Sequence, residues 1–170
     1  MHKVIILGFP LLFLLVVDSF QWEKHLRGVC ERVIDGDTIQ LAGRRVRLEG
    51  IDAPELNQFS LDKLPIGVMS RNFLKQRIEG KKILVQYRKK DRYGRLLGRL
   101  YQQGEDINRL MIQQGWAVVY RDQSLLPVQY VARLKRQGIY QSFGFMHPAI
   151  FRKKKAARRQ LDKNKISKEF

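Results

Sequence analysis

The sequence predicts an α+β domain in which five short strands form a small barrel and the helices occupy separate segments of the chain. Two observations predict it: turn residues divide the chain into short segments, and these run as three strands, a helix, two strands and two helices. Segregated strands and helices are typical of α+β folds, and a five-stranded barrel is their natural closure. The length of 170 residues suits one such domain with short appendages.

The predicted strands are short runs of aliphatic and β-branched residues bounded by turn signals. The Asp-Gly-Asp sequence at 35–37 and the Ala-Gly sequence at 42–43 supply tight turns between the first three strands. The strands are predicted over 28–34, 38–41, 45–51, 82–88 and 96–101.

Three segments carry apolar residues at helical spacing, and each is followed by a glycine where a helix would stop. The segment 56–66 has no such pattern and is predicted to be a loop. The helices are predicted over 68–78, 107–114 and 125–137.

The composition indicates a folded, strongly basic chain. Lysine and arginine number 33 against 16 acidic residues, a formal charge of +17, while 44% of the residues are hydrophobic. That apolar content argues against disorder throughout, and the charge favours a polyanionic partner, with nucleic acid first and anionic lipid second. The single cysteine, Cys30, excludes an internal disulfide and a cysteine-based metal cluster.

The N-terminus predicts export. Residues 4–17 are a run of fourteen mostly aliphatic residues, which is short for a membrane span of about 20 residues and fits a secretory signal. We therefore expect a signal peptide over 1–19, a linker over 20–27 and the barrel domain over 28–150. The expected location is secreted or periplasmic, and the alternative is a membrane anchor formed by uncleaved residues 4–17.

The C-terminal segment 151–170 forms a basic tail. It holds nine lysines and arginines against two acidic residues, a net charge of +7. We expect a solvated, frayed tail that acts as a non-specific phosphate-binding arm.

Acidic residues gather where the predicted strands end. Asp37, Asp52 and Glu55 would repel one another unless a cation lay among them. Oxygen ligands without histidine or cysteine favour Ca²⁺ or Mg²⁺. Ala53 precedes a proline, which favours an extended backbone whose carbonyl could be a further ligand. The alternative for Asp35 and Asp37 alone is a pair of Asx turns.

Two arginines accompany these acidic residues. Strand alternation places Arg47 on the face opposite Val46 and Leu48, away from the core. Arg95 follows the acidic turn at 91–94. In so basic a chain each could be ordinary surface charge, whereas two guanidinium groups near a metal could clamp a phosphate.

The order of these clusters carries more information than each one separately. The strings VIDGDTIQL, RLEGIDAPE and DRYGR resemble the signature segments of the staphylococcal nuclease (thermonuclease) family. The string NRLMIQQGWAVVY at 108–120 is similar to a later helix and strand of that family. The resemblance extends from about residue 28 to about residue 140 and keeps the spacing of the motifs.

The resemblance implies a Ca²⁺ site. Asp37 and Asp52 would be its carboxylate ligands, and Ala53 would provide its main-chain oxygen. The family often has threonine at this last position, but a backbone ligand does not depend on the side chain. Asp35 would lie behind these ligands and support them.

The resemblance also implies the catalytic groups. Glu55 would orient or deprotonate the attacking water, while Arg47 and Arg95 would bind the phosphate and stabilise the transition state. Contacts to a terminal phosphate and to the nucleotide are implied for Arg92, Tyr93 and Tyr120.

The implied protein is an exported Ca²⁺-dependent nuclease on an oligonucleotide-binding-type β-barrel with three helices. It would cleave DNA and/or RNA with little sequence preference and leave 3′-phosphate ends. We expect a monomer with no protein partner. The alternatives are an inactive nucleic-acid-binding barrel, against which the acidic and arginine positions argue, and a basic membrane-surface protein, which leaves the motifs unexplained.

Overall fold

The computed structural model describes residues 24–166. The predicted signal peptide, with its alternative as an anchor, lies outside the described residues. Between 24 and 166, no helix is both long enough and apolar enough to span a bilayer.

Five strands form the predicted closed barrel. Antiparallel ladders join β1 to β2, β2 to β3, β1 to β5 and β5 to β6. A parallel pairing of β3 with β6 closes the circle, so the predicted five-stranded barrel is confirmed. The strands are β1 (Lys24–Val33), β2 (Thr38–Leu41), β3 (Arg44–Leu48), β5 (Lys82–Lys90) and β6 (Leu96–Gln102).

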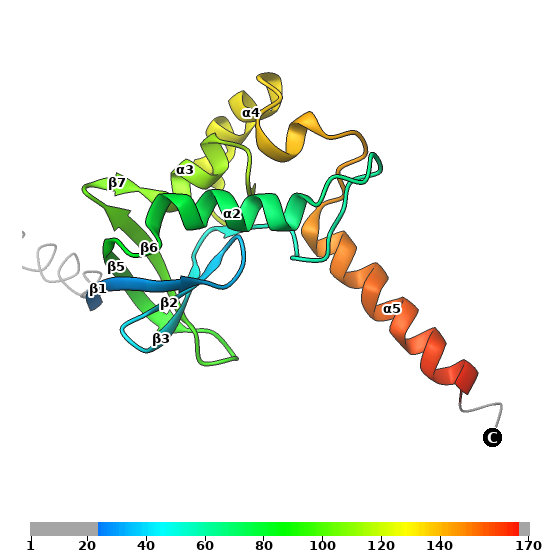
Figure 1. Cartoon of the computed structure of the whole chain (residues 1–170), viewed down its shortest axis with the longest axis horizontal. Coiled ribbons are helices and arrows are strands. Elements are labelled where there is room, and N and C mark those ends of the chain that lie inside the picture. Colours follow the sequence, from blue (N-terminus) through cyan, green and yellow to red (C-terminus); the bar gives the residue numbers. More distant parts are fainter. Residues whose placement is uncertain (1–23, 167–170) are drawn as a thin grey trace, which may run out of the picture.

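The helices flank this barrel, as Figure 1 shows. The three predicted helices are present as α2 (Ile66–Ile78), α3 (Ile107–Gln113) and α4 (Leu126–Leu134). A further helix, α5 (Pro148–Ile166), projects away from the body. Short elements complete the described part: β4 (Ile51–Asp52), β7 (Glu105–Asp106), β8 (Val118–Val119) and 3-10 turns at Gln123–Leu125 and Gly138–Gln141.

The barrel interior forms the hydrophobic core, and alternation along the strands explains it. Every second residue of β2, β3, β5 and β6 points inward, where aliphatic side chains avoid water. α2 and α3 add further apolar side chains to the same cluster. Fully buried members include Ile39, Leu41, Val46, Leu48, Leu74, Ile78, Val85, Leu100 and Met111.

Three segments differ from the sequence prediction. β1 begins at Lys24, because residues 24–27 of the predicted linker pair with β5. The third predicted strand stops at Leu48, and after a two-residue turn β4 pairs with β8 instead. The basic segment predicted to be a frayed tail is helical from Pro148 to Ile166.

Asn108 fixes the segment that leads from the barrel to β4. It is almost fully buried at the start of α3. Its side-chain nitrogen donates to the carbonyls of Glu49 and Gly98 at 2.8 and 3.1 Å. Its side-chain oxygen accepts from the Leu100 backbone N–H at 3.0 Å. One amide therefore ties α3, β6 and the turn after β3 together.

Replacing this amide should destabilise the fold. Asn108→Ala leaves buried backbone groups without partners, so the free energy of unfolding should fall by about 3 kcal/mol. Urea denaturation followed by circular dichroism measures this. The exposed neighbour Arg109→Ala is the control and should leave the midpoint unchanged. Coincident curves for the two variants would contradict the role of Asn108.

Candidate active site

A tight Asp-Gly-Asp turn between β1 and β2 begins the site. The Asp37 backbone N–H donates to the Asp35 side chain at 3.0 Å, as in an Asx turn. A Cβ on Gly36 would lie 2.2 Å from the Ser70 hydroxyl oxygen and 2.6 Å from the Ala53 Cβ. Only glycine therefore lets this turn pack against α2, and the packing directs Asp37 inward.

Asp37 is buried and fully hydrogen-bonded. One carboxylate oxygen accepts from the Thr38 hydroxyl at 3.0 Å and from Arg47 Nη1 at 2.8 Å. The other accepts from the Ala53 backbone N–H at 3.0 Å. Burial raises the pKa of Asp37 to about 7; repulsion from Asp35 adds to this, while Arg47 and the Ala53 N–H oppose it. Positive charge is therefore favourable beside this carboxylate.

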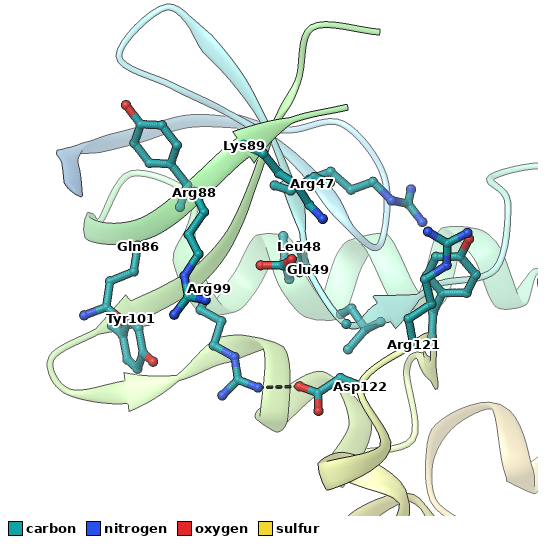
Figure 2. A pocket seen from close by; sticks show the side chains of 15 residues that line it. Arg47, Leu48, Glu49, Gln86, Arg88, Lys89, Arg99, Tyr101, Arg121 and Asp122 are labelled. Carbon is teal, nitrogen blue, oxygen red and sulfur yellow. Dashed lines mark hydrogen bonds and ion pairs between the residues drawn. The ribbon is translucent and has the colours of Figure 1, made fainter. Parts of the chain in front are cut away.

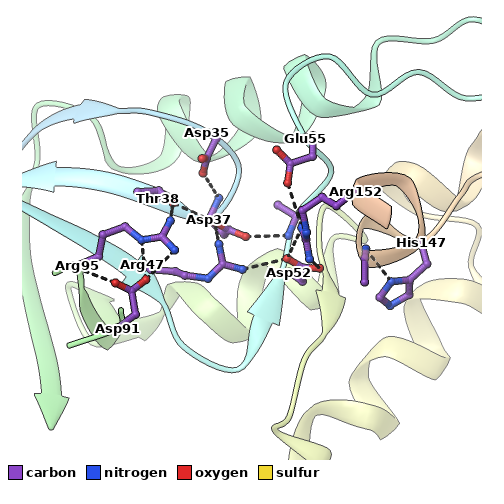
Figure 3. A network of polar contacts seen from close by, with 12 residues as sticks. Asp35, Asp37, Thr38, Arg47, Asp52, Glu55, Asp91, Arg95, His147 and Arg152 are labelled. Carbon is purple, nitrogen blue, oxygen red and sulfur yellow. Dashed lines mark hydrogen bonds and ion pairs between the residues drawn. The ribbon is translucent and has the colours of Figure 1, made fainter. Parts of the chain in front are cut away.

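Arg47 joins Asp37 to Asp52, as Figure 3 shows. Its Nη2 donates to Asp52 Oδ1 at 2.9 Å, and the Asp52 side chain is completely buried on β4. Burial would lower the pKa of Arg47, but the carboxylates of Asp37 and Asp52 outweigh it and raise the pKa. Because one planar guanidinium reaches both carboxylates, the two face a common point.

Glu55 is held by its backbone while its side chain stays accessible. A Cβ on Gly67 would lie 1.7 Å from the Glu55 carbonyl oxygen, so α2 approaches this loop more closely than any other residue would permit. Buried Gln58 accepts from the Glu55 N–H at 3.3 Å and donates its own backbone N–H to the Glu55 carbonyl at 2.7 Å. The Glu55 side chain keeps 39% of its surface exposed.

The turn between β5 and β6 presents Arg95. Asp91 organises it by accepting from the backbone N–H groups of Tyr93 and Arg95 at 2.9 and 3.0 Å. The same carboxylate forms an ion pair with Arg95 Nη2 at 2.7 Å, while Arg95 Nη1 lies 3.5 Å from the Thr38 hydroxyl oxygen. The exposed Tyr93 ring lies beneath the guanidinium groups of Arg92 and Arg95 at 4.8 and 5.4 Å.

The structure brings the predicted site residues together around one groove of ≈ 700 Å³. Asp52 alone does not line it and lies beneath it, against Arg47. The other nine line the groove directly: Asp35, Asp37, Arg47, Ala53, Glu55, Arg92, Tyr93, Arg95 and Tyr120.

A second groove of ≈ 660 Å³ adjoins the first, and Figure 2 shows it. The two share Arg47, Lys89 and Arg121 in their walls. The second continues along β5 and β6 past Arg99, whose guanidinium is paired with Asp122. Together they form a basic trough along the barrel, which suits a chain of phosphates.

Among the groove residues that were not predicted, Arg121 and Arg152 stand out by their contacts with predicted ones. Arg121 lines both grooves and lies 5.0 Å from the centre of the Tyr120 ring, with a left-handed backbone (φ 65°). The sequence held one indication of this role, since Arg121 directly follows Tyr120, a predicted nucleotide contact. Arg152, from α5, donates Nη1 to Asp52 at 3.1 Å and to Glu55 at 3.0 Å, and Nη2 to Asp52 at 2.8 Å. These hydrogen bonds, led by those to Asp52, raise the pKa of Arg152.

The oxygen atoms of this site are of the kind that hard cations prefer. Asp37 and Asp52 offer carboxylate oxygens at a common point, and the Ala53 carbonyl is close by in the chain. In the described part of the chain, no three histidine, cysteine or acidic side chains are grouped as they would be around a metal ion. The protein would thus provide two carboxylates and a carbonyl, and water would complete the coordination.

Known proteins are similar in sequence to most of this chain. The family model described as "Staphylococcal nuclease homologue" matches residues 45–142. An "Uncharacterized endonuclease" of Escherichia coli O157:H7 is 35% identical over 153 residues, covering 83% of this chain and 96% of the relative. "Micrococcal nuclease" of Shigella flexneri is 32% identical over 158 residues, covering 82% and 87%. "Protein ParB" of Escherichia coli is 34% identical over 167 residues, covering 87% and 90%.

The family match spans more than half of the chain and includes β3, β4, β5 and β6, the strands that carry Arg47 and Asp52 and border the Arg95 turn. The match also spans most of the length of the two nuclease relatives, 96% and 87%. The barrel, the groove and these matches agree: the chain is a nuclease that belongs to the staphylococcal nuclease family.

Proposed function

We propose that the protein is an exported, Ca²⁺-dependent nuclease that hydrolyses DNA and/or RNA with little sequence preference and leaves 3′-phosphate ends. The observation that carries this proposal is the joint placement of two buried carboxylates that Arg47 bridges. Asp37 lines the groove that also presents Glu55 and Arg95, and Asp52 lies beneath it. Acidic oxygens and guanidinium groups at one groove suit a metal and a phosphate together. The apolar run at 4–17 supports export.

Asp37, Asp52 and the Ala53 carbonyl would hold the cation. Both carboxylates are fixed by hydrogen bonds from different elements, so little ordering is needed when an ion binds. A bound Ca²⁺ would supply positive charge beside the phosphate and stabilise the charge that develops there. Asp35 supports Asp37 from behind, by accepting its backbone N–H.

Arg47 and Arg95 would stabilise the phosphate. They come from β3 and from the β5–β6 turn, and both line the same groove. Their side chains keep 19% and 21% of their surface exposed, so a ligand in the groove could reach them. Planar guanidinium groups match the geometry of phosphate oxygens and favour the more highly charged transition state.

Glu55 would act on the attacking water. Its side chain is accessible, whereas the predicted metal carboxylates Asp37 and Asp52 are buried. Its carboxylate lies near buried Asp52, because Arg152 Nη1 contacts both residues. A carboxylate so placed could orient a water for in-line attack on phosphorus and accept its proton, while the 5′ oxygen leaves.

The trough supports recognition of the backbone rather than of base sequence. Its walls carry cationic side chains, together with the exposed rings of Tyr93 and Tyr120. Phosphate contacts and base stacking depend little on sequence. α5 extends this surface, since residues 152–163 carry seven lysines and arginines against one aspartate.

Hydrolysis assays on the full chain test the proposal. With Ca²⁺ we expect cleavage of single-stranded DNA, with Mg²⁺ weaker cleavage, and with chelator none, because the buried carboxylates need the cation. End-group analysis should find 3′-phosphates. Cleavage that is insensitive to chelator would contradict the metal, and 5′-phosphate products would contradict the proposed leaving oxygen.

Glu55→Gln separates binding from chemistry. We expect kcat to fall by about 100-fold or more, because the amide cannot accept the proton, while the Kd for DNA changes little. Rapid-quench turnover and fluorescence anisotropy measure the two quantities. Glu105→Gln is a matched control, because Glu105 is also paired with an arginine and has the same 39% exposure. Equal kcat for both variants would exclude Glu55 from catalysis.

The outer turns of α5 should contribute salt-sensitive affinity. Changing Lys153, Lys154, Arg158 and Arg159 to glutamine should flatten the plot of log Kd against log salt by about 2 to 3 for single-stranded DNA, through lost phosphate contacts. The Glu55→Gln background in chelator prevents cleavage.

A control variant for α5 removes the same charge elsewhere. Arg27, Lys81, Lys82 and Arg109 are exposed and lie on β1, β5 and α3 or beside them. Their change to glutamine should lower the slope much less. Equal slopes for the two quadruple variants would mean that net charge, not α5, determines the affinity.

A further inference from the structure

Arg152 lies on the carboxylates that a metal ion would need. Its guanidinium contacts both oxygens of Asp52, at 3.1 and 2.8 Å, and one oxygen of Glu55 at 3.0 Å. Asp52 Oδ1 also accepts from Arg47. Both oxygens of Asp52 are therefore already engaged by arginine, and an ion that binds there must compete for them.

The chain before α5 holds Arg152 in this place. The Gln58 side chain, from the loop that carries Glu55, donates to the Met146 carbonyl at 2.6 Å. In the same loop, the Asp62 side chain accepts from the Phe143 backbone N–H at 3.2 Å. His147 then accepts the Ala149 N–H at 3.3 Å at the start of α5. These contacts place the first turn of α5 beside Glu55.

Of the two arginines on Asp52, Arg152 is the one that can leave. Its side chain is 41% exposed, against 19% for Arg47, which is also held by Asp37. An exposed guanidinium regains water when it leaves a carboxylate, so Arg152 leaves Asp52 more readily than the less exposed Arg47 does. Release from Asp52 would also free Glu55, because Arg152 Nη1 contacts both residues.

We propose that Arg152 is an internal counter-ion that competes with the divalent cation for Asp52, so that metal binding displaces Arg152 from Asp52 and Glu55. The inference rests on the proposed function, because it takes Asp37 and Asp52 as the metal carboxylates. It adds that the metal-free protein has its own cation at the site. Metal affinity is lower than the carboxylates alone would give, and Glu55 becomes free only when the ion is bound.

Calorimetric titration of the full chain with Ca²⁺ tests the competition without an activity assay. Arg152→Gln should bind Ca²⁺ about tenfold more tightly than the unaltered chain, because the ion no longer displaces a bound guanidinium. Arg159→Gln removes the same charge from the exposed outer part of α5 and should stay within about twofold, since solvent screens it. Arg152→Lys keeps the charge without the planar fork and should fall between them.

Thermal unfolding gives a second readout. In chelator, Arg152→Gln should lower Tm, because the buried carboxylate of Asp52 loses a partner. Saturating Ca²⁺ should remove most of this difference, because the ion then replaces the guanidinium. Arg152→Lys retains a positive charge beside Asp52, so it can be measured in the same way if Arg152→Gln fails to fold.

Equal or weaker Ca²⁺ binding by Arg152→Gln would overturn the inference, because it would show that Arg152 does not compete with the ion. If this result accompanies Ca²⁺-dependent cleavage, the inference alone fails. If no chain binds Ca²⁺ and none cleaves, the proposed function fails with it. The inference would also be overturned if Arg159→Gln bound Ca²⁺ as tightly as Arg152→Gln does. That result would show a general effect of charge.

Discussion

The site depends on one electrostatic constraint: two buried carboxylates, Asp37 and Asp52, must share positive charge. Arg47 meets this constraint by donating to both, at 2.8 and 2.9 Å. Without a cation between them the carboxylates would repel in a poorly solvated position. Burial raises the pKa of Asp37, and repulsion from Asp35 and, less strongly, from Asp52 adds to this. The same demand for positive charge that holds Arg47 in the structure suits the site to a metal ion and a phosphate.

Barrel closure creates this arrangement. Thr38 pairs with Arg47 across β2 and β3, and Arg47 pairs with Leu97 across the parallel β3–β6 junction. That junction brings the β5–β6 turn, with Arg95, beside the strand that carries Arg47. Three charged clusters that are separate in the chain therefore meet at one groove because the sheet closes on itself.

The contacts of Arg152 relate the stability of the metal-free protein to its chemistry. Charged groups gathered at a groove are costly when they lack partners. The structure offsets this with its own ions: Arg95 pairs with Asp91, and Arg152 with Asp52 and Glu55. Groups that would act on substrate are thus held by internal ion pairs, and Arg152 is the partner that we propose the metal ion displaces.

The sequence by itself determined the five barrel strands in outline, the helices α2, α3 and α4, and nine of the residues that line the groove. Alternation and turn residues are local signals, so they placed Arg47 off the core and located the acidic turns correctly. The helix α5 is a local feature that the prediction of a frayed tail missed, since its alanine, lysine, arginine and glutamine residues favour helix. Tertiary structure alone decided that β1 begins at Lys24 and that Arg152 reaches Asp52, a hundred residues away. These features have no period to detect, because they come from strand pairing and long-range ion pairs that exist only when distant segments pack together.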